Sequence, residues 1–140
     1  MLELGVKTLL AYLLGSLIGS LLVGQLRGGV DIRKLGSGNA GGTNALRTQG
    51  WGFALWVMVV GIGKGIFAAA VIPPLAIPGV GIDPAVDRAL VLYGVAFAAI
   101  LGHVFPVWFE FRGGKGGATA AGLVCYLAPA AALPVLGTWL

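Results

Sequence analysis

Long apolar runs alternate with short polar segments along the whole chain. Four apolar segments cover residues 5–26, 51–75, 89–109 and 117–140. Each is about 20 residues or more, which in a helix rising about 1.5 Å per residue is enough to cross the roughly 30 Å hydrocarbon core of a bilayer. None shows the apolar–polar alternation of a β-strand. The pattern therefore predicts an all-α fold, a polytopic membrane helix bundle with about four transmembrane helices.

Small residues recur at a spacing of four within two of these segments. Gly15 and Gly19 fall on one face of the first, and Gly61 and Gly65 fall on one face of the second. Small residues at this spacing let two helix backbones approach closely. We therefore expect both faces to be helix–helix contacts.

The composition favours a bilayer over water as the solvent. Hydrophobic residues make up 58% of the chain and charged residues 10%, against about 25% charged in an ordinary soluble domain. The net charge of +4 would suggest nucleic acid in a soluble protein, but these cations lie in short loops between apolar runs. That placement indicates membrane topology and no nucleic-acid partner. With one cysteine and one histidine in the chain, the sequence predicts no metal site and no cofactor.

The polar loops alternate in charge. Residues 27–50 contain four cations and one aspartate, a net charge of +3, and residues 110–116 have a net charge of +1. Residues 76–88 between them have a net charge of −1. Since cytoplasmic loops are enriched in lysine and arginine, we expect the first and third loops in the cytoplasm and both termini outside.

The first loop contains a motif rich in glycine and asparagine, residues 36–44, followed by Arg47. Glycine lets successive backbone N–H groups form a concave anion site. Amide and hydroxyl side chains add neutral donors, and the planar guanidinium of Arg47 can bind a phosphate through two hydrogen bonds. The alternative is a flexible connection between helices. The candidate phosphate-binding residues are Ser37, Gly38, Asn39, Thr43, Asn44 and Arg47.

A second glycine-rich motif, residues 113–119, opens the last apolar segment. Backbone donors at a helix N-terminus attract anions, and a lysine within the motif adds a point charge. The alternative is an ordinary solvated, positively charged loop. The candidates here are Gly113, Gly114, Lys115, Gly116 and Thr119.

Two further polar residues lie within apolar segments. His103, near the end of the third, is a candidate general base, or a hydrogen-bonding partner of a helix end or a phosphate. Lys64 lies in the second, where a lysine is either functional or extends its ammonium group to the membrane surface.

These segments resemble the bacterial acyl-phosphate:glycerol-3-phosphate acyltransferase family (PlsY). Residues 12–16, 29–33 and 36–47 are similar to the first half of that family, and residues 102–106 and 111–119 to its second signature. The resemblance covers nearly the whole chain and predicts a single integral-membrane domain over residues 1–140. The family's third conserved cytoplasmic segment, near its C-terminus, has no counterpart in these residues, so we expect a domain that lacks it.

The resemblance implies transfer of a fatty acyl group from acyl phosphate to the 1-hydroxyl of glycerol 3-phosphate in phospholipid biosynthesis. The products are lysophosphatidate and phosphate. It implies a bacterial plasma (inner) membrane location. From the charge of the loops we expect the active site to face the cytoplasm. For catalysis we expect Arg47 and Lys115 to hold phosphates, and His103 or a substrate phosphate oxygen to act as the base. Departures from the family pattern are Ile18 in place of proline and Gly61 in place of an acidic residue.

An acyl phosphate is an activated mixed anhydride, so direct attack by the hydroxyl requires no covalent intermediate. No Ser-His-Asp set is evident in the sequence. Two alternative functions are a small anion transporter, since glycine-interrupted helices bind anions in transporters too, and a non-catalytic membrane subunit.

Overall fold

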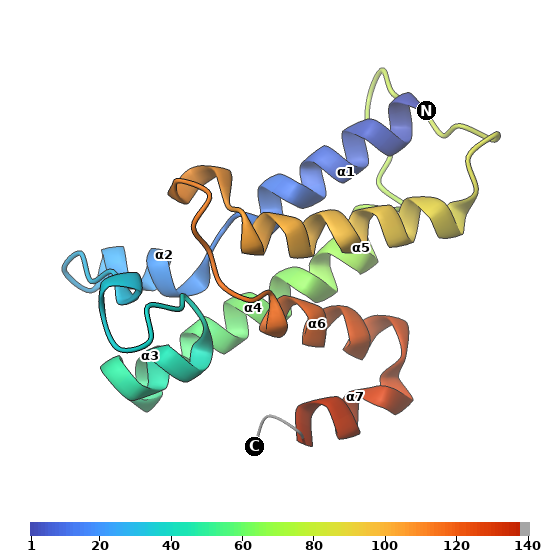
Figure 1. Ribbon diagram of the computed structural model, residues 1–140. Coiled ribbons are helices and arrows are strands. Elements are labelled where there is room, and N and C mark those ends of the chain that lie inside the picture. The colour runs from blue at the N-terminus through green and yellow to red at the C-terminus, as the bar shows by residue number, and fades with distance from the viewer. Residues whose placement is uncertain (138–140) are drawn as a thin grey trace.

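The computed structural model describes residues 1–137, which form an elongated helical bundle without a β-strand among them (Figure 1). The α-helices are α1 (Leu2–Gly15), α2 (Gly19–Leu26), α3 (Gly42–Gln49), α4 (Trp51–Val71), α5 (Arg88–Val104), α6 (Gly117–Leu127) and α7 (Pro129–Gly137). Two short 3-10 helices are η1 (Ile32–Lys34) and η2 (Val107–Phe109).

The predicted membrane helix bundle is confirmed, with fewer continuous spans than the four expected. Among the described residues, α4 with 21 residues and the stretch Arg88–Phe109 with 22 are each long and apolar enough to cross a bilayer. Helices α1 and α2 together would form a third span, bent by 47°. Helix α6 has only 11 residues, too few to cross the hydrocarbon core alone.

The fourth apolar segment, predicted as one span, is divided into α6 and α7. The division falls at Ala128, whose backbone is outside the helical region with φ −144° and ψ 72°. Pro129 follows it, and the residue before a proline is disfavoured in the α region. Residues 138–140, the end of the predicted span, lie outside the described part of the chain.

The bend between α1 and α2 falls at residues 16–18, between two Gly-Ser pairs, a common place for sharp kinks. Lys64 of α4 donates hydrogen bonds to two backbone carbonyl oxygens at the bend. Its Nζ donates to the carbonyl of Gly15 at 2.5 Å and to that of Leu17 at 2.7 Å. Lys64 is only 6% exposed, so its ammonium group stays inside the protein and does not reach the membrane surface.

Small residues hold two helix pairs together, α1 along α5 and α4 along α6. A Cβ added at Gly15 would collide with the backbone of α5, and one added at Gly61 or Gly65 would collide with α6. Gly19, predicted to share a face with Gly15, contacts α4 instead, because the bend turns α2 away from α5.

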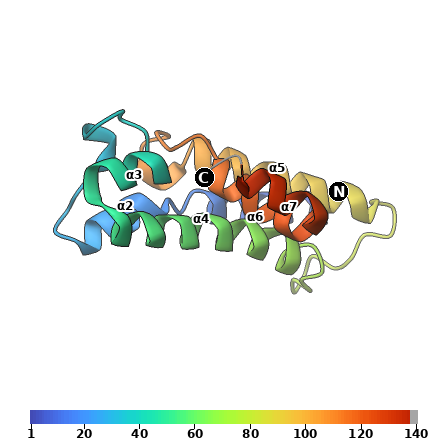
Figure 2. The same cartoon turned by 90° about the horizontal axis from the view of Figure 1, so that it is seen from below.

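The polar segments gather at the two ends of the bundle. Helices α2 and α3, η1 and the segment around η2, residues 105–112 (the η2 segment), lie at one end (Figures 1 and 2). The N-terminus and the connection between α4 and α5 lie at the other. This grouping agrees with the alternating charge of the loops.

A buried ion network closes the end that holds the N-terminus. The Glu3 carboxylate accepts from Lys7 Nζ at 2.7 Å and from the Arg88 guanidinium at 2.7 and 2.9 Å. Lys7 also donates to the Pro73 carbonyl at 2.5 Å. The side chains of Glu3 and Lys7 are fully buried, so this pair joins α1 to the connection between α4 and α5.

Two glycines of α4 should respond differently to substitution with alanine. A Cβ at Gly65 would lie 3.1 Å from the Leu123 amide and against the Thr119 carbonyl, whereas one at Gly63 meets nothing within 4 Å. Overpacking costs about 1–3 kcal/mol. Gly65→Ala should therefore lower the midpoint of thermal unfolding in detergent, and Gly63→Ala should leave it unchanged or slightly raise it. Equal midpoints for the two variants would contradict close packing of α4 on α6.

Candidate functional site

Arg33 connects the first polar loop to the η2 segment. Its guanidinium forms an ion pair with Asp31 at 2.7 Å and donates to the carbonyls of Phe109 at 2.9 Å and Arg112 at 3.0 Å. The hydrogen bonds from Arg33 lower the pKa of the Asp31 carboxyl. The pair thus adds stability above the ordinary aspartate pKa and loses it as pH falls through the lowered value. Arg33 fixes residues 31–35 beside the η2 segment.

Asn44 holds the glycine-rich loop in shape. Its Nδ2 donates to the carbonyls of Ile32 at 3.0 Å, Leu35 at 3.0 Å and Asn39 at 2.9 Å. Its Oδ1 accepts from the Ser37 amide at 3.1 Å. Asn44 is 2% exposed. We expected it to donate to a phosphate, but its amide is already fully bonded to the loop backbone.

The second glycine-rich loop folds back over the end of α5. The Gly113 amide donates to the Val104 carbonyl and the Gly114 amide to the His103 carbonyl, both at 3.2 Å. These two backbone donors, predicted to face an anion, therefore complete the last turn of α5. A Cβ at Gly114 would lie 2.7 Å from His103 Nε2, so glycine lets the loop pass directly over the imidazole ring.

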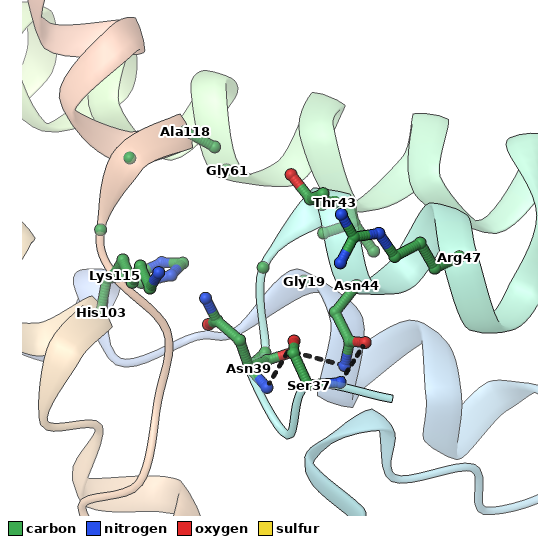
Figure 3. A pocket seen from close by; sticks show the side chains of 16 residues that line it. Gly19, Ser37, Asn39, Thr43, Asn44, Arg47, Gly61, His103, Lys115 and Ala118 are labelled. Carbon is green, nitrogen blue, oxygen red and sulfur yellow. Dashed lines mark hydrogen bonds between the residues drawn. The ribbon is translucent and has the colours of Figure 1, made fainter. Parts of the chain in front are cut away.

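A cavity of about 320 Å³ lies between the two loops (Figure 3). Figure 3 shows the side chains of Asn39, Thr43 and Arg47 on one side of it and Lys115 and His103 on the other. Apolar residues of α4 and α6 line its remaining wall. The lining residues are Gly19, Ser37, Asn39, Ala40, Gly41, Gly42, Thr43, Asn44, Arg47, Val57, Gly61, His103, Lys115, Gly116, Gly117 and Ala118.

Three helices begin at this cavity. Gly19, Gly42 and Gly117 are the first residues of α2, α3 and α6, and all three line it. The first amide groups of a helix have no partner within the helix, and the helix dipole is positive at that end. The backbone alone therefore makes the cavity attractive to an anion.

Two cations from different loops add to this field. Arg47 and Lys115 line the cavity with exposed side chains. Neither side chain forms a hydrogen bond or an ion pair with any residue between 1 and 137. Both therefore remain available to a bound anion. In the same described range no three side chains of His, Cys, Asp or Glu are grouped as metal ligands.

His103 lines the cavity although it is only 6% exposed. Its Nδ1 lies 3.3 Å from the hydroxyl of Thr119, which is fully buried. Thr119, predicted to bind phosphate, instead contacts the imidazole from behind the cavity wall.

The structure brings eight of the predicted residues to the cavity and leaves four outside its lining. Those that line it are Ser37, Asn39, Thr43, Asn44, Arg47, His103, Lys115 and Gly116. Gly38, Gly113, Gly114 and Thr119 do not line it; they shape the loops or contact His103. The sequence did not mark Gly19, Gly61 or Arg33 as site residues. The two glycines were assigned to helix packing, and Arg33 was counted among the cations of the first loop.

Comparisons with known proteins point to one family. The sequence model described as glycerol-3-phosphate acyltransferase matches residues 6–140. The glycerol-3-phosphate acyltransferases of Chlorobaculum tepidum and Chlorobium luteolum are 44% and 40% identical over 131 residues, which are 93% of this chain and 56% of each relative. The chain thus spans little more than half the length of these curated relatives.

The fold is shared with a solved membrane enzyme. The chain is similar to crystal structures of PlsY (YgiH), an integral membrane glycerol 3-phosphate acyltransferase. The glycerol 3-phosphate form matches with a TM-score of 0.76 and 37% identity. The lysophosphatidic acid form matches with a TM-score of 0.74 and 36% identity. Each match covers 97% of this chain and 63% or 62% of that protein.

Replacing Asn44 should loosen the first loop. Asn44→Asp places a carboxylate against three carbonyl oxygens, and each buried polar group left unpaired costs about 1–3 kcal/mol. Amide hydrogen exchange of residues 32–44 should become faster. Asn39→Ala is the matched control, because no hydrogen bond of the Asn39 side chain is formed within the described residues. Similar exchange in both variants would contradict the role of Asn44 in holding the loop.

Proposed function

Because this chain belongs to the glycerol-3-phosphate acyltransferase family, we propose that it takes part in the acylation of glycerol 3-phosphate. The acyl donor in this proposal is a fatty acyl phosphate, and the products are lysophosphatidate and phosphate. The observation that carries the proposal is the cavity between the two loops. Three helix N-termini meet there with two cations, Arg47 and Lys115, that have no side-chain partner within residues 1–137. The related PlsY has crystal structures of a glycerol 3-phosphate form and a lysophosphatidic acid form. In the proposed reaction these two compounds are the acceptor and the acylated product.

Both substrates of the proposed reaction carry a phosphate, which suits a cavity with two separate cations. Arg47 offers a planar fork of donors and Lys115 a compact point charge. Ser37, Asn39 and Thr43 line the same cavity and supply neutral donors. We assign these five side chains to substrate binding. Asn44 has a positioning role, because its amide holds the loop.

The reaction needs an oriented hydroxyl and stabilisation of a departing phosphate. The 1-hydroxyl oxygen of glycerol 3-phosphate forms a bond to the acyl carbonyl carbon, and the bond from that carbon to the phosphate oxygen breaks. Orthophosphate leaves with the bonding electron pair. The hydroxyl proton passes to His103, which lines the cavity, or to an oxygen of the departing phosphate. Arg47 and Lys115 stabilise the charge that develops on that phosphate.

The proposed location is the bacterial plasma membrane, with the cavity at the cytoplasmic surface. The first loop, at the end of the bundle that holds the cavity, has a net charge of +3, whereas residues 76–88 at the opposite end have a net charge of −1. Positively charged loops remain in the cytoplasm. Cytoplasmic placement also gives the cavity access to a water-soluble phosphate ester.

Arg47→Lys should lower acyl transfer while preserving insertion into the membrane. Lysine keeps the charge but cannot form the two parallel hydrogen bonds of a guanidinium. Loss of a charged hydrogen bond costs about 1.5–3 kcal/mol, or roughly ten- to a hundredfold in rate. Initial rates of phosphate release, measured at varied concentrations of each substrate, also identify which KM rises and hence which phosphate Arg47 binds.

Arg27→Lys is the matched control for this variant. Arg27 lies in the same loop and is exposed, but it is not among the residues that line the cavity. It should retain the rates of the unmodified protein. Equal rates for Arg47→Lys and Arg27→Lys would contradict phosphate binding by Arg47 and leave it only a role in setting membrane orientation.

Single cysteines should report the proposed orientation. In a Cys125→Ala background, Leu35→Cys lies in the first loop and Ala85→Cys lies in the connection between α4 and α5, and both positions are exposed. An impermeant maleimide added to intact cells should label Ala85→Cys at once and Leu35→Cys only after permeabilisation. The reverse order of labelling would invert the orientation.

A further inference from the structure

The bend between α1 and α2 places the C-terminal end of α1, which is partially negative, near a cavity proposed to bind an anion. Helix α1 ends at Gly15, and the C-terminal end of a helix carries partial negative charge on its free carbonyl groups. Four residues later α2 begins at Gly19, which lines the cavity. The same short stretch thus presents a negative helix end close to the positive one.

Lys64 covers that negative end. Its ammonium group donates to the carbonyls of Gly15 at 2.5 Å and Leu17 at 2.7 Å. It reaches this position from α4, one turn after Gly61, which is another lining residue of the cavity. A buried ammonium group therefore lies on two carbonyl oxygens of the stretch that leads into Gly19, a lining residue of the cavity.

The bend also fixes part of the first loop. Ser20, the second residue of α2, donates from its hydroxyl to the Ala40 carbonyl at 2.7 Å, and Ala40 lines the cavity. The direction in which α2 leaves the bend therefore sets the position of two wall segments, Gly19 and Ala40.

We propose that Lys64 is a positioning residue for phosphate binding, acting through its charge on the bend between α1 and α2. It neutralises the C-terminal end of α1, so that only the positive end of α2 faces the anion. This role rests on the proposed function for the identity of the anion, a phosphate group. Lys64 does not touch the substrate.

Lys64→Gln separates this charge effect from a purely structural one. A glutamine amide has two N–H donors for the two carbonyls but no positive charge. Affinity for orthophosphate and for glycerol 3-phosphate, measured by isothermal titration calorimetry of the purified protein in detergent, should fall about fivefold or more, the size of a helix-end charge effect. Lys64→Arg keeps the charge and should retain most of the affinity.

Lys7→Gln is the matched control. Lys7 is also a buried lysine that donates to a backbone carbonyl, that of Pro73, but it lies in the ion network at the other end of the bundle. Its replacement should leave phosphate affinity unchanged in the folded protein. Unchanged affinity in Lys64→Gln, or an equal loss in Lys7→Gln, would overturn the proposal, as would a failure of the unmodified protein to bind orthophosphate. Acyl transfer is assayed separately, so that its absence contradicts the proposed activity without altering the comparison of affinities.

Discussion

A backbone carbonyl that leaves a helix near the hydrocarbon of a bilayer must find its donor within the protein. Several non-helical segments within residues 1–137 receive hydrogen bonds from side chains of other elements. Lys64 serves the bend at residues 16–18, and Asn44 serves the first loop. Arg33 and Tyr12 serve the η2 segment, the latter through a 2.6 Å bond to the Phe105 carbonyl. A few polar side chains therefore connect these segments to the helices.

This arrangement divides the polar residues into two groups with different tasks. Asn44 and Arg33 are bonded to backbone and hold the two loops in place. Arg47 and Lys115 form no such bonds with the described residues and face the cavity. A site whose walls are already fixed does not have to order them when an anion binds, which lowers the entropic cost of binding. The residues that hold the two loops and the cations that remain available to an anion are thus distinct.

Apolar length in the sequence was sufficient to predict α4 and α5, and the two glycine-rich motifs correctly indicated both sides of the cavity. Apolar length could not reveal the bend in the first segment, because its donor, Lys64, is 49 and 47 residues from the two carbonyls that it bonds. The glycines that flank the bend were interpreted only as helix-packing residues. The roles of Asn44 and Arg33 depend likewise on contacts between distant segments. Pro129 indicated the division at Ala128. The prediction of one continuous span relied on the length of the apolar run and was wrong.

The two cations that face the cavity are made at different times. Arg47 and Lys115 are 68 positions apart in the chain, and at about 5–20 residues per second of synthesis the second follows the first by roughly 3 to 14 seconds. For most of that interval the η2 segment that Arg33 holds has not been translated, and α6 begins only after Lys115. The nascent chain consequently has half an anion site and gains the complete one only when its third polar loop has been translated and α6 has packed on α4.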